Sequence, residues 1–239
     1  MLSINQKKYL NSLKQKKYRN QHSTFIVEGE KMVNELIASN YEVEVVYGTE
    51  GLSLYSELIE VNEKELNSIT TLKTPNKFFA IAKQKQNDSY QLDGKLVLAL
   101  DNIQDPGNLG TIIRIADWFG ISTIICSPTC VDVYNPKVVQ ATMGSIFRIN
   151  VCYTELKDFF TQNKNLNVYG ALLGGDNIYN TTIKKENSVL LMGNESKGIS
   201  TDLLDFINHK ITIPQFGQAE SLNVAIATAI LCSEYQRGI

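Results

Sequence analysis

The hydrophobic positions of this chain fall into short apolar runs, separated by segments in which apolar residues recur at helical spacing. Such runs are typical of buried strands, and the segments between them are typical of amphipathic helices. Up to residue 83 the pattern predicts a small α/β unit. Its expected elements are helices at about 3–20 and 31–38, strands at 25–27, 43–47 and 78–82, and one further strand and helix within 57–69.

From Lys95 onward the alternation becomes regular and predicts a second, larger α/β unit. Its expected strands are 96–100, 123–126, 147–151, 168–172, 189–192 and 210–213. Its expected helices are 109–119, 136–141, 156–162, 202–208 and 222–235. Apolar strands that alternate with helices are typical of a mainly parallel sheet covered on both faces.

A polar stretch separates the two units. Residues 83–91 contain almost no apolar side chain, and Asp93-Gly94 follows, which is typical of a linker between compact domains. We therefore expect an N-terminal domain over residues 1–86, a linker over 87–94 and a C-terminal domain over 95–239.

Composition narrows the class of protein. The chain has 239 residues, of which 43% are hydrophobic, enough for two cores. No stretch approaches the roughly 18 consecutive apolar residues of a membrane helix, and the start lacks the apolar segment of a signal peptide. We therefore predict a cytoplasmic protein that does not enter a membrane. Four cysteines without C-x-x-C spacing and two histidines argue against a zinc site, so we expect no metal and reduced, buried thiols.

The charge is unevenly distributed. The net charge is −2, but residues 1–20 carry +6 and no acidic side chain. Tyr9 and Tyr18 lie among these bases, a composition suited to phosphate contacts and to stacking on unpaired bases. A solvated terminal helix explains the same segment equally well. The candidate RNA-binding residues are Lys7, Lys8, Lys14, Lys16, Lys17 and Arg19.

A first motif, DNIQDPGNLG from Asp101 to Gly110, follows a predicted strand and opens a helix. Asp105 with Pro106 is typical of a helix N-terminus, so capping is part of its expected role. Arg114 stands in an otherwise apolar stretch of that helix, where an unpaired guanidinium would be costly. We expect it to have an anionic partner, for which an RNA phosphate is suitable.

A second motif, GNESKG from Gly193 to Gly198, follows the predicted strand at 189–192. It has the outline of a phosphate loop but lacks the G-K-[ST] ending of a Walker loop, and G-x-G-x-x-G occurs nowhere in the chain. Glu195 is its candidate functional side chain, expected to hold neighbouring loops or Arg114 in place. A solvated surface carboxylate is the alternative interpretation.

A third motif, IPQFGQAESLNVA from Ile213 to Ala225, joins the last predicted strand to the last helix. Ser221 is a suitable N-cap, which would place Asn223 in the first turn beside unpaired backbone N–H groups. The helix itself is apolar nearly all round, so it needs cover on two sides. A second subunit is the favoured cover, and we predict a homodimer.

Together the three motifs resemble the SpoU family of RNA ribose 2'-O-methyltransferases over residues 95–237, and the segment KYRNQHSTFIVEGEKMVNELI is similar to that family's substrate-binding domain. The resemblance implies a C-terminal domain with the trefoil-knotted SPOUT fold, preceded by a small α/β RNA-binding domain, and S-adenosylmethionine as cofactor. The catalytic residues it implies are Asn108, Arg114, Glu195, Ser221 and Asn223. The cofactor-binding residues it implies are Leu173, Gly174, Met192, Gly193, Asn194, Gly198, Ile213, Pro214, Leu222, Asn223 and Ala225.

The expected activity is methyl transfer to a ribose 2'-hydroxyl of structured RNA. Ribosomal RNA is favoured over transfer RNA because the N-terminal domain resembles that of ribosomal RNA enzymes. The alternatives are a tRNA methyltransferase, a non-catalytic RNA-binding assembly factor with the same fold, and a nucleotide-binding enzyme of small-molecule metabolism. The missing phosphate loops and the basic N-terminal segment argue against the last.

Overall fold

The computed structural model describes residues 1–49, 57–74, 76–85, 90, 92, 95–184 and 186–237. It divides into two compact units. Unit 1 consists of Met1–Gln86 and Asp132–Arg148, and unit 2 of Asn87–Val131 and Ile149–Ile239. Among the described residues, no helix has the length and apolar character to cross a membrane.

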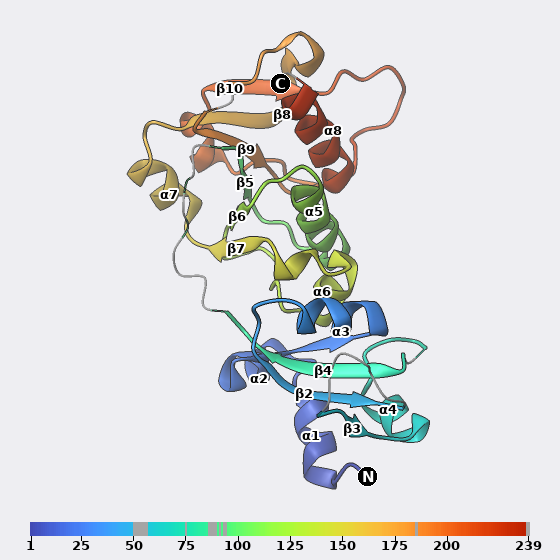
Figure 1. Cartoon of the computed structure of the whole chain (residues 1–239). Helices are drawn as coiled ribbons and strands as arrows, with labels where there is room; N and C mark the ends of the chain where they lie inside the picture. The colour runs from blue at the N-terminus through green and yellow to red at the C-terminus, as the bar shows by residue number, and fades with distance from the viewer. Residues whose placement is uncertain are drawn as a thin grey trace. The chain divides into compact units, whose positions relative to one another are not determined.

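Unit 1 is built on a four-stranded sheet (Figure 1). Its strands in spatial order are β1 (Thr24–Glu28), β4 (Phe78–Lys83), β2 (Val43–Gly48) and β3 (Ile59–Glu60). β4 pairs antiparallel with β1 and β2, while β3 is parallel to β2. The helices of its N-terminal segment are α1 (Ile4–Ser12), α2 (Lys16–His22), α3 (Glu30–Ile37) and α4 (Glu63–Ile69).

The single helix predicted over residues 3–20 is wrong, because the chain breaks between α1 and α2. Leu10 and Leu13 are fully buried on either side of the end of α1. The break leaves backbone carbonyls without helical partners. Arg19 Nη1 donates 3.0 Å hydrogen bonds to the carbonyls of Leu13 and Lys14, which satisfies them.

The assignment of residues 132–148 to unit 1 differs from the expected C-terminal domain over 95–239. This segment contains α6 (Pro136–Thr142) and the 3-10 turn η1 (Ser145–Phe147). The Tyr134 ring lies 4.6 Å from that of Phe25 in β1, and Phe147 packs on Tyr41. Hydrophobic contact with the N-terminal residues therefore determines where the segment packs. Of the linker predicted at 87–94, all but residues 90 and 92 lies outside the described residues.

Unit 2 is built on a six-stranded sheet in which every paired neighbour is parallel (Figure 1). Its spatial order is β10 (His209–Thr212), β8 (Asn167–Asn177), β9 (Ser188–Met192), β5 (Val97–Leu100), β6 (Thr123–Cys126) and β7 (Asn150–Tyr153). The predicted α/β class with a parallel sheet is confirmed. The trefoil knot stays a prediction.

Helices cover both faces of this sheet (Figure 1). On one face, α7 (Leu156–Gln162) and the 3-10 turn η3 (Thr201–Phe206) pack in one core with the strands. On the other, α5 (Pro106–Trp118) lies against α8 (Val224–Arg237), near the short 3-10 turn η2 (Ile178–Asn180). Two predictions were wrong in detail, because the strand placed at 147–151 begins at Asn150 and the helix placed at 202–208 is η3.

Candidate functional site

The three motifs follow the carboxyl ends of β5, β9 and β10, which are parallel strands of the unit 2 sheet. The last residues of β5 and β9, Leu100 and Met192, are register partners, so the first and second motifs begin side by side. β8 and β10 continue the sheet beyond β9. In open parallel sheets ligands bind outside the carboxyl ends of the strands, where the strand order reverses. This edge is therefore the candidate site.

The second motif is tied to the start of the first. The carboxylate of Asp101 is buried and accepts a 2.8 Å hydrogen bond from the backbone N–H of Ser200. Asn194 Nδ2 donates to the backbone carbonyl of Asn102 at 2.9 Å. Asn194 Oδ1 also accepts from the N–H groups of Ser196 and Lys197, at 3.0 and 3.1 Å. Asn194 therefore shapes the loop through its side chain.

Two glycines are required by the geometry of this loop. A Cβ atom added to Gly193 would lie 2.3 Å from backbone atoms of Gly198 and Ile199, closer than atoms can approach. Gly198 has a φ of +71°, which L-residues rarely adopt. The loop closes through mutual backbone hydrogen bonds between Asn194 and Gly198, 2.9 and 3.0 Å long.

Three of the five predicted catalytic residues are joined by hydrogen bonds across the motifs. Asn108 Nδ2 donates to Glu195 Oε1 at 2.5 Å, and Asn223 Nδ2 donates to Asn108 Oδ1 at 2.9 Å. Asn223 Oδ1 accepts from the N–H groups of Ala225 and Ile226 at 3.0 and 3.3 Å. Since a backbone N–H is always a donor, these contacts fix the orientation of both amides. We name this arrangement the Glu195–Asn108–Asn223 chain.

The N-cap predicted for α5 is correct, whereas the N-cap predicted for α8 is not. Asp105 caps α5 by accepting from the N–H of Asn108 at 2.9 Å, and Pro106 occupies the first turn, as predicted. Ser221 does not cap the last helix. That helix begins at Val224, and the Asn223 side chain caps it instead, while Ser221 is exposed in the preceding loop.

Arg114 is exposed on α5 and lies outside this chain of hydrogen bonds. Ile112 and Ile113 are fully buried, but the helix turns Arg114 outward, where water solvates its guanidinium. No described residue forms an ion pair or a hydrogen bond with its side chain. The burial from which an anionic partner was expected is therefore wrong, and an RNA phosphate as that partner stays a prediction. Glu195 holds Asn108 instead of Arg114.

The predicted cofactor residues surround the ends of β8, β9 and β10. β8 bulges between Gly170, which pairs with Lys210, and Asp176, which pairs with Ile211. Leu173 in this bulge is 81% exposed, and Gly174 has a φ of +76°. Ile213 and Pro214 directly follow β10. These residues therefore come from three strands that are adjacent in the sheet, and their joint role in cofactor binding stays a prediction.

The sequence analysis missed Ser127 and Cys130, whose side chains accept hydrogen bonds from the backbone at the start of the first motif. Ser127 Oγ accepts from the N–H of Asn102 at 2.9 Å, and Cys130 Sγ accepts from the N–H of Ile103 at 3.2 Å. A hydrogen bond with the Cys126 thiol, aided by others from Ser127 and Ile103, lowers the pKa of Cys130 to about 7 despite its burial. Their position just after β6, the neighbour of β5, is the only signal in the sequence.

In unit 1 the predicted RNA-binding residues separate into two groups. Lys8, Lys14, Lys16 and Lys17 are exposed, and Lys7 is half-buried. Arg19 is a correction, because its side chain is 2% exposed and Nη2 pairs with Asp132 at 2.5 Å. Its other donors go to Asp132 and to backbone carbonyls. Because these contacts use its guanidinium within unit 1, Arg19 has a structural role, and we no longer count it among the RNA-binding residues.

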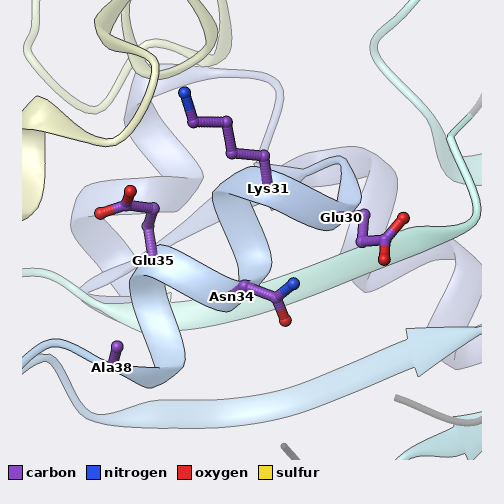
Figure 2. Close-up of a pocket in the computed structure, with 5 residues that line it drawn as sticks. All are labelled: Glu30, Lys31, Asn34, Glu35 and Ala38. Carbon is purple, nitrogen blue, oxygen red and sulfur yellow. The ribbon is translucent and has the colours of Figure 1, made fainter. Parts of the chain in front are cut away.

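A shallow hollow on α3 in unit 1 is drawn in Figure 2. Its lining residues are Glu30, Lys31, Asn34, Glu35 and Ala38. Glu35 pairs with Arg148 at 2.6 Å. The lining carries both signs of charge and shares no residue with the three motifs. The described residues contain no cluster of three or more His, Cys, Asp or Glu side chains that could hold a metal ion, and the absence of a metal stays a prediction.

Two family models and a curated relative match this chain. The model of the SpoU rRNA Methylase family matches residues 95–233, and the model of the MRM3-like substrate binding domain matches residues 5–80. The 23S rRNA (guanosine(2553)-2'-O)-methyltransferase RlmP of Bacillus subtilis (strain 168) is 33% identical over 224 residues, which cover 90% of each chain.

Two solved structures share the whole fold. A putative RNA methyltransferase of the TrmH family from Porphyromonas gingivalis is 38% identical, with a TM-score of 0.90 over 99% of both chains. An AdoMet-bound rRNA methyltransferase from Sinorhizobium meliloti is 32% identical, with a TM-score of 0.90 over 99% of this chain and 97% of that one. These similarities confirm the resemblance that the three motifs indicated.

Proposed function

The chain belongs to the SpoU rRNA Methylase family, and we propose that it transfers a methyl group from S-adenosylmethionine to a ribose 2'-hydroxyl of ribosomal RNA. The observation that carries this proposal is the Glu195–Asn108–Asn223 chain, which joins all three motifs at the carboxyl edge of the unit 2 sheet. It places fixed amide and carboxylate groups beside loops suited to a nucleoside.

The residues at this edge fit an adenosyl cofactor. Such a ligand has a flat apolar face and polar edges, which apolar side chains and backbone groups recognise. Leu173 and Leu222 are 81% and 47% exposed at the β8 bulge and before α8. The contact of Gly193 with Gly198 brings backbone close where any side chain would intrude. The proposed binding residues are those predicted from the resemblance, Leu173, Gly174, Met192, Gly193, Asn194, Gly198, Ile213, Pro214, Leu222, Asn223 and Ala225.

The bound cofactor supplies an electrophilic methyl group, and the protein orients the hydroxyl that receives it. Asn108 and Asn223 have fixed amide orientations and position the ribose, and Glu195 holds Asn108 in that orientation. Ser221, exposed two residues before Asn223, offers a hydroxyl to the same substrate.

Arg114 acts on the charge of the substrate. A guanidinium stays protonated in proteins, so Arg114 is not the base. Its planar group of donors suits a bidentate contact with an RNA phosphate and stabilises the oxygen as its negative charge develops. The proton of the hydroxyl passes to phosphate, carboxylate or water. Because Arg114 is exposed on α5, RNA can reach it without a rearrangement of the core.

Ribosomal RNA is the substrate to test first. The curated relative RlmP is named for 23S rRNA, and the N-terminal match is to a substrate-binding domain. The exposed lysines of α1 and α2 add affinity for phosphate that does not depend on sequence. Homodimer formation and a cytoplasmic location complete the proposal.

The decisive experiment maps ribose methylation in ribosomal and transfer RNA from cells with and without the gene. We expect one 2'-O-methyl group to disappear from 23S rRNA and to return when the purified protein and S-adenosylmethionine are added. Loss of a tRNA methyl group would favour the tRNA enzyme. Tight RNA binding with no change in any methyl group would favour the non-catalytic assembly factor. Either result would overturn the proposal.

A further inference from the structure

The loop between β10 and α8 carries a large aromatic side chain in solvent. Phe216 is 92% exposed, and it lies in the connecting segment that Figure 1 draws between β10 and α8. An exposed phenylalanine side chain forgoes the favourable transfer of its apolar surface out of water. Because Phe216 belongs to the third motif, we expect a ligand of the site to cover its ring.

The backbone around Phe216 is organised. Gln215 Nε2 donates hydrogen bonds to the carbonyls of Gly217 and Ala219, at 2.9 and 2.8 Å. The residue before Phe216 is thereby tied to two residues that follow it, which limits the freedom of the loop. A side chain presented from a restrained loop loses less conformational entropy on binding than one on a loose chain.

The surroundings indicate what kind of partner covers it. Every residue from Gln215 to Asn223 is exposed, and the residues directly beside Phe216, namely Gln215, Gly217 and Gln218, have no apolar side chain. The other large apolar residue of the loop, Leu222, is six positions away and is assigned above to the cofactor. The buried centre of a protein–protein interface needs a contiguous apolar patch, which Phe216 and its immediate neighbours do not form. An unpaired nucleobase fits better, because stacking on a π-face needs one ring and tolerates polar neighbours.

We propose that Phe216 stacks on an unpaired base of the RNA substrate, at the methylated nucleotide or directly beside it. This rests on the proposed function. The same loop ends at Asn223, which bonds to Asn108, so Phe216 and the Glu195–Asn108–Asn223 chain are linked through one short segment of the third motif. Phe216 is a substrate-binding residue that sets the position of the nucleotide and contributes nothing to cofactor affinity.

The first test compares Phe216→Ala, Phe216→Trp and the matched control Gln218→Ala in methyl transfer to unmethylated 23S rRNA transcript. Loss of one stacked base, about 1–3 kcal/mol, corresponds to a KM for RNA raised about 5- to 150-fold in Phe216→Ala. Phe216→Trp and Gln218→Ala should remain near wild type. S-adenosylmethionine affinity by calorimetry and dimer mass by light scattering should not change. An unchanged KM, a weaker cofactor affinity or a dissociated dimer would each overturn the proposal.

A double-mutant cycle identifies the base. Three transcripts carry an abasic site at the nucleotide that methylation mapping identifies, or at its 5' or 3' neighbour. With one of them Phe216→Ala should bind as tightly as wild type, because its stacking partner is missing. An effect that persists with all three contradicts stacking. If the stacking test fails in this way but wild-type protein still transfers methyl groups to 23S rRNA, only the stacking proposal is overturned and the proposed function stands. If wild-type protein transfers none to any 23S rRNA transcript, the proposed function itself fails.

Discussion

The side-chain amide of Asn223 donates a 2.9 Å hydrogen bond to the side-chain oxygen of Asn108, a residue 115 positions earlier in the chain. It joins the start of α8 to the start of α5. Because Asn223 also caps α8, its amide nitrogen has a fixed direction, and Asn108 in turn directs its own amide nitrogen at Glu195. Two helix starts and one loop are therefore held as a unit.

Replacing Glu195 with Gln should slow methyl transfer with little loss of stability. The change keeps an acceptor for Asn108 but removes the charge that strengthens the bond. A misplaced Asn108 should cost up to about 100-fold in the single-turnover rate. Glu220→Gln, an exposed acid in the β10–α8 loop, is the control. Equal rates for the two variants would remove Glu195 from the site.

Gly193→Ala should destabilise unit 2 and weaken cofactor binding together. The added methyl group would overlap the backbone of Gly198 and Ile199. Overpacking of this kind costs about 1–3 kcal/mol or more, which corresponds to several degrees in Tm. Gly217→Ala is the matched control, because its Cβ would meet no atom within 4 Å. A normal Tm for Gly193→Ala in thermal unfolding would show that the loop can open.

Sequence pattern predicted most of the unit 2 sheet and the motif positions, since each motif directly follows a strand. It could not predict which polar groups meet. The pairing of Asn108 with Asn223 depends on α5 and α8 packing together, and spacing along the chain does not reveal that packing. Ser221 and Asn223 are both acceptable caps by residue type, so only the start of the helix at Val224 decides between them.

In unit 1 the sequence could not predict the ion-pair partner of Arg19. Arg19 looked like one of six similar bases, but its carboxylate partner is Asp132, far along the chain. The same ion pair adds to the aromatic contacts that pack residues 132–148 against the N-terminal segment. Arg114 is the reverse case, because apolar neighbours in sequence suggested burial while the helix turns its side chain into solvent.

The exposed lysines of α1 and α2 should supply salt-dependent RNA affinity. Changing Lys8, Lys16 and Lys17 to Ala should weaken RNA binding and flatten its salt slope by up to about 0.7–0.9 for each phosphate that is no longer neutralised. Deleting residues 1–20 is not an equivalent test, since it removes the core residues Leu10 and Leu13. The control changes Lys157, Lys164 and Lys210, three exposed lysines of unit 2. Equal slopes for the two triple variants in a salt titration would reject the assignment.

The apolar side chains left exposed on α5 and α8 should lie in a homodimer interface. Trp118 is 84% exposed and Ile226 is 55% exposed, on helices that pack together. Ile226→Asp should convert dimer to monomer in light scattering, since a buried unpaired charge is costly. Thr201→Asp, at an exposed residue of η3 on the other face of the sheet, should leave the dimer intact. A monomer mass for dilute wild-type protein would contradict the prediction.

Arg114 provides the most direct test of the mechanism, because its side chain forms no hydrogen bond or ion pair with another described residue and is free to bind the substrate. Arg114→Lys keeps the charge but loses the planar group of donors, so a substantial residual rate would indicate charge stabilisation alone. The measurement is single-turnover transfer of labelled methyl to 23S rRNA by Arg114→Ala, alongside calorimetric S-adenosylmethionine binding and thermal unfolding. We predict that transfer is abolished or severely reduced while cofactor affinity and Tm stay near wild type. Transfer at the wild-type rate would contradict the mechanism, and loss of cofactor binding together with activity would place Arg114 on the cofactor instead of the RNA.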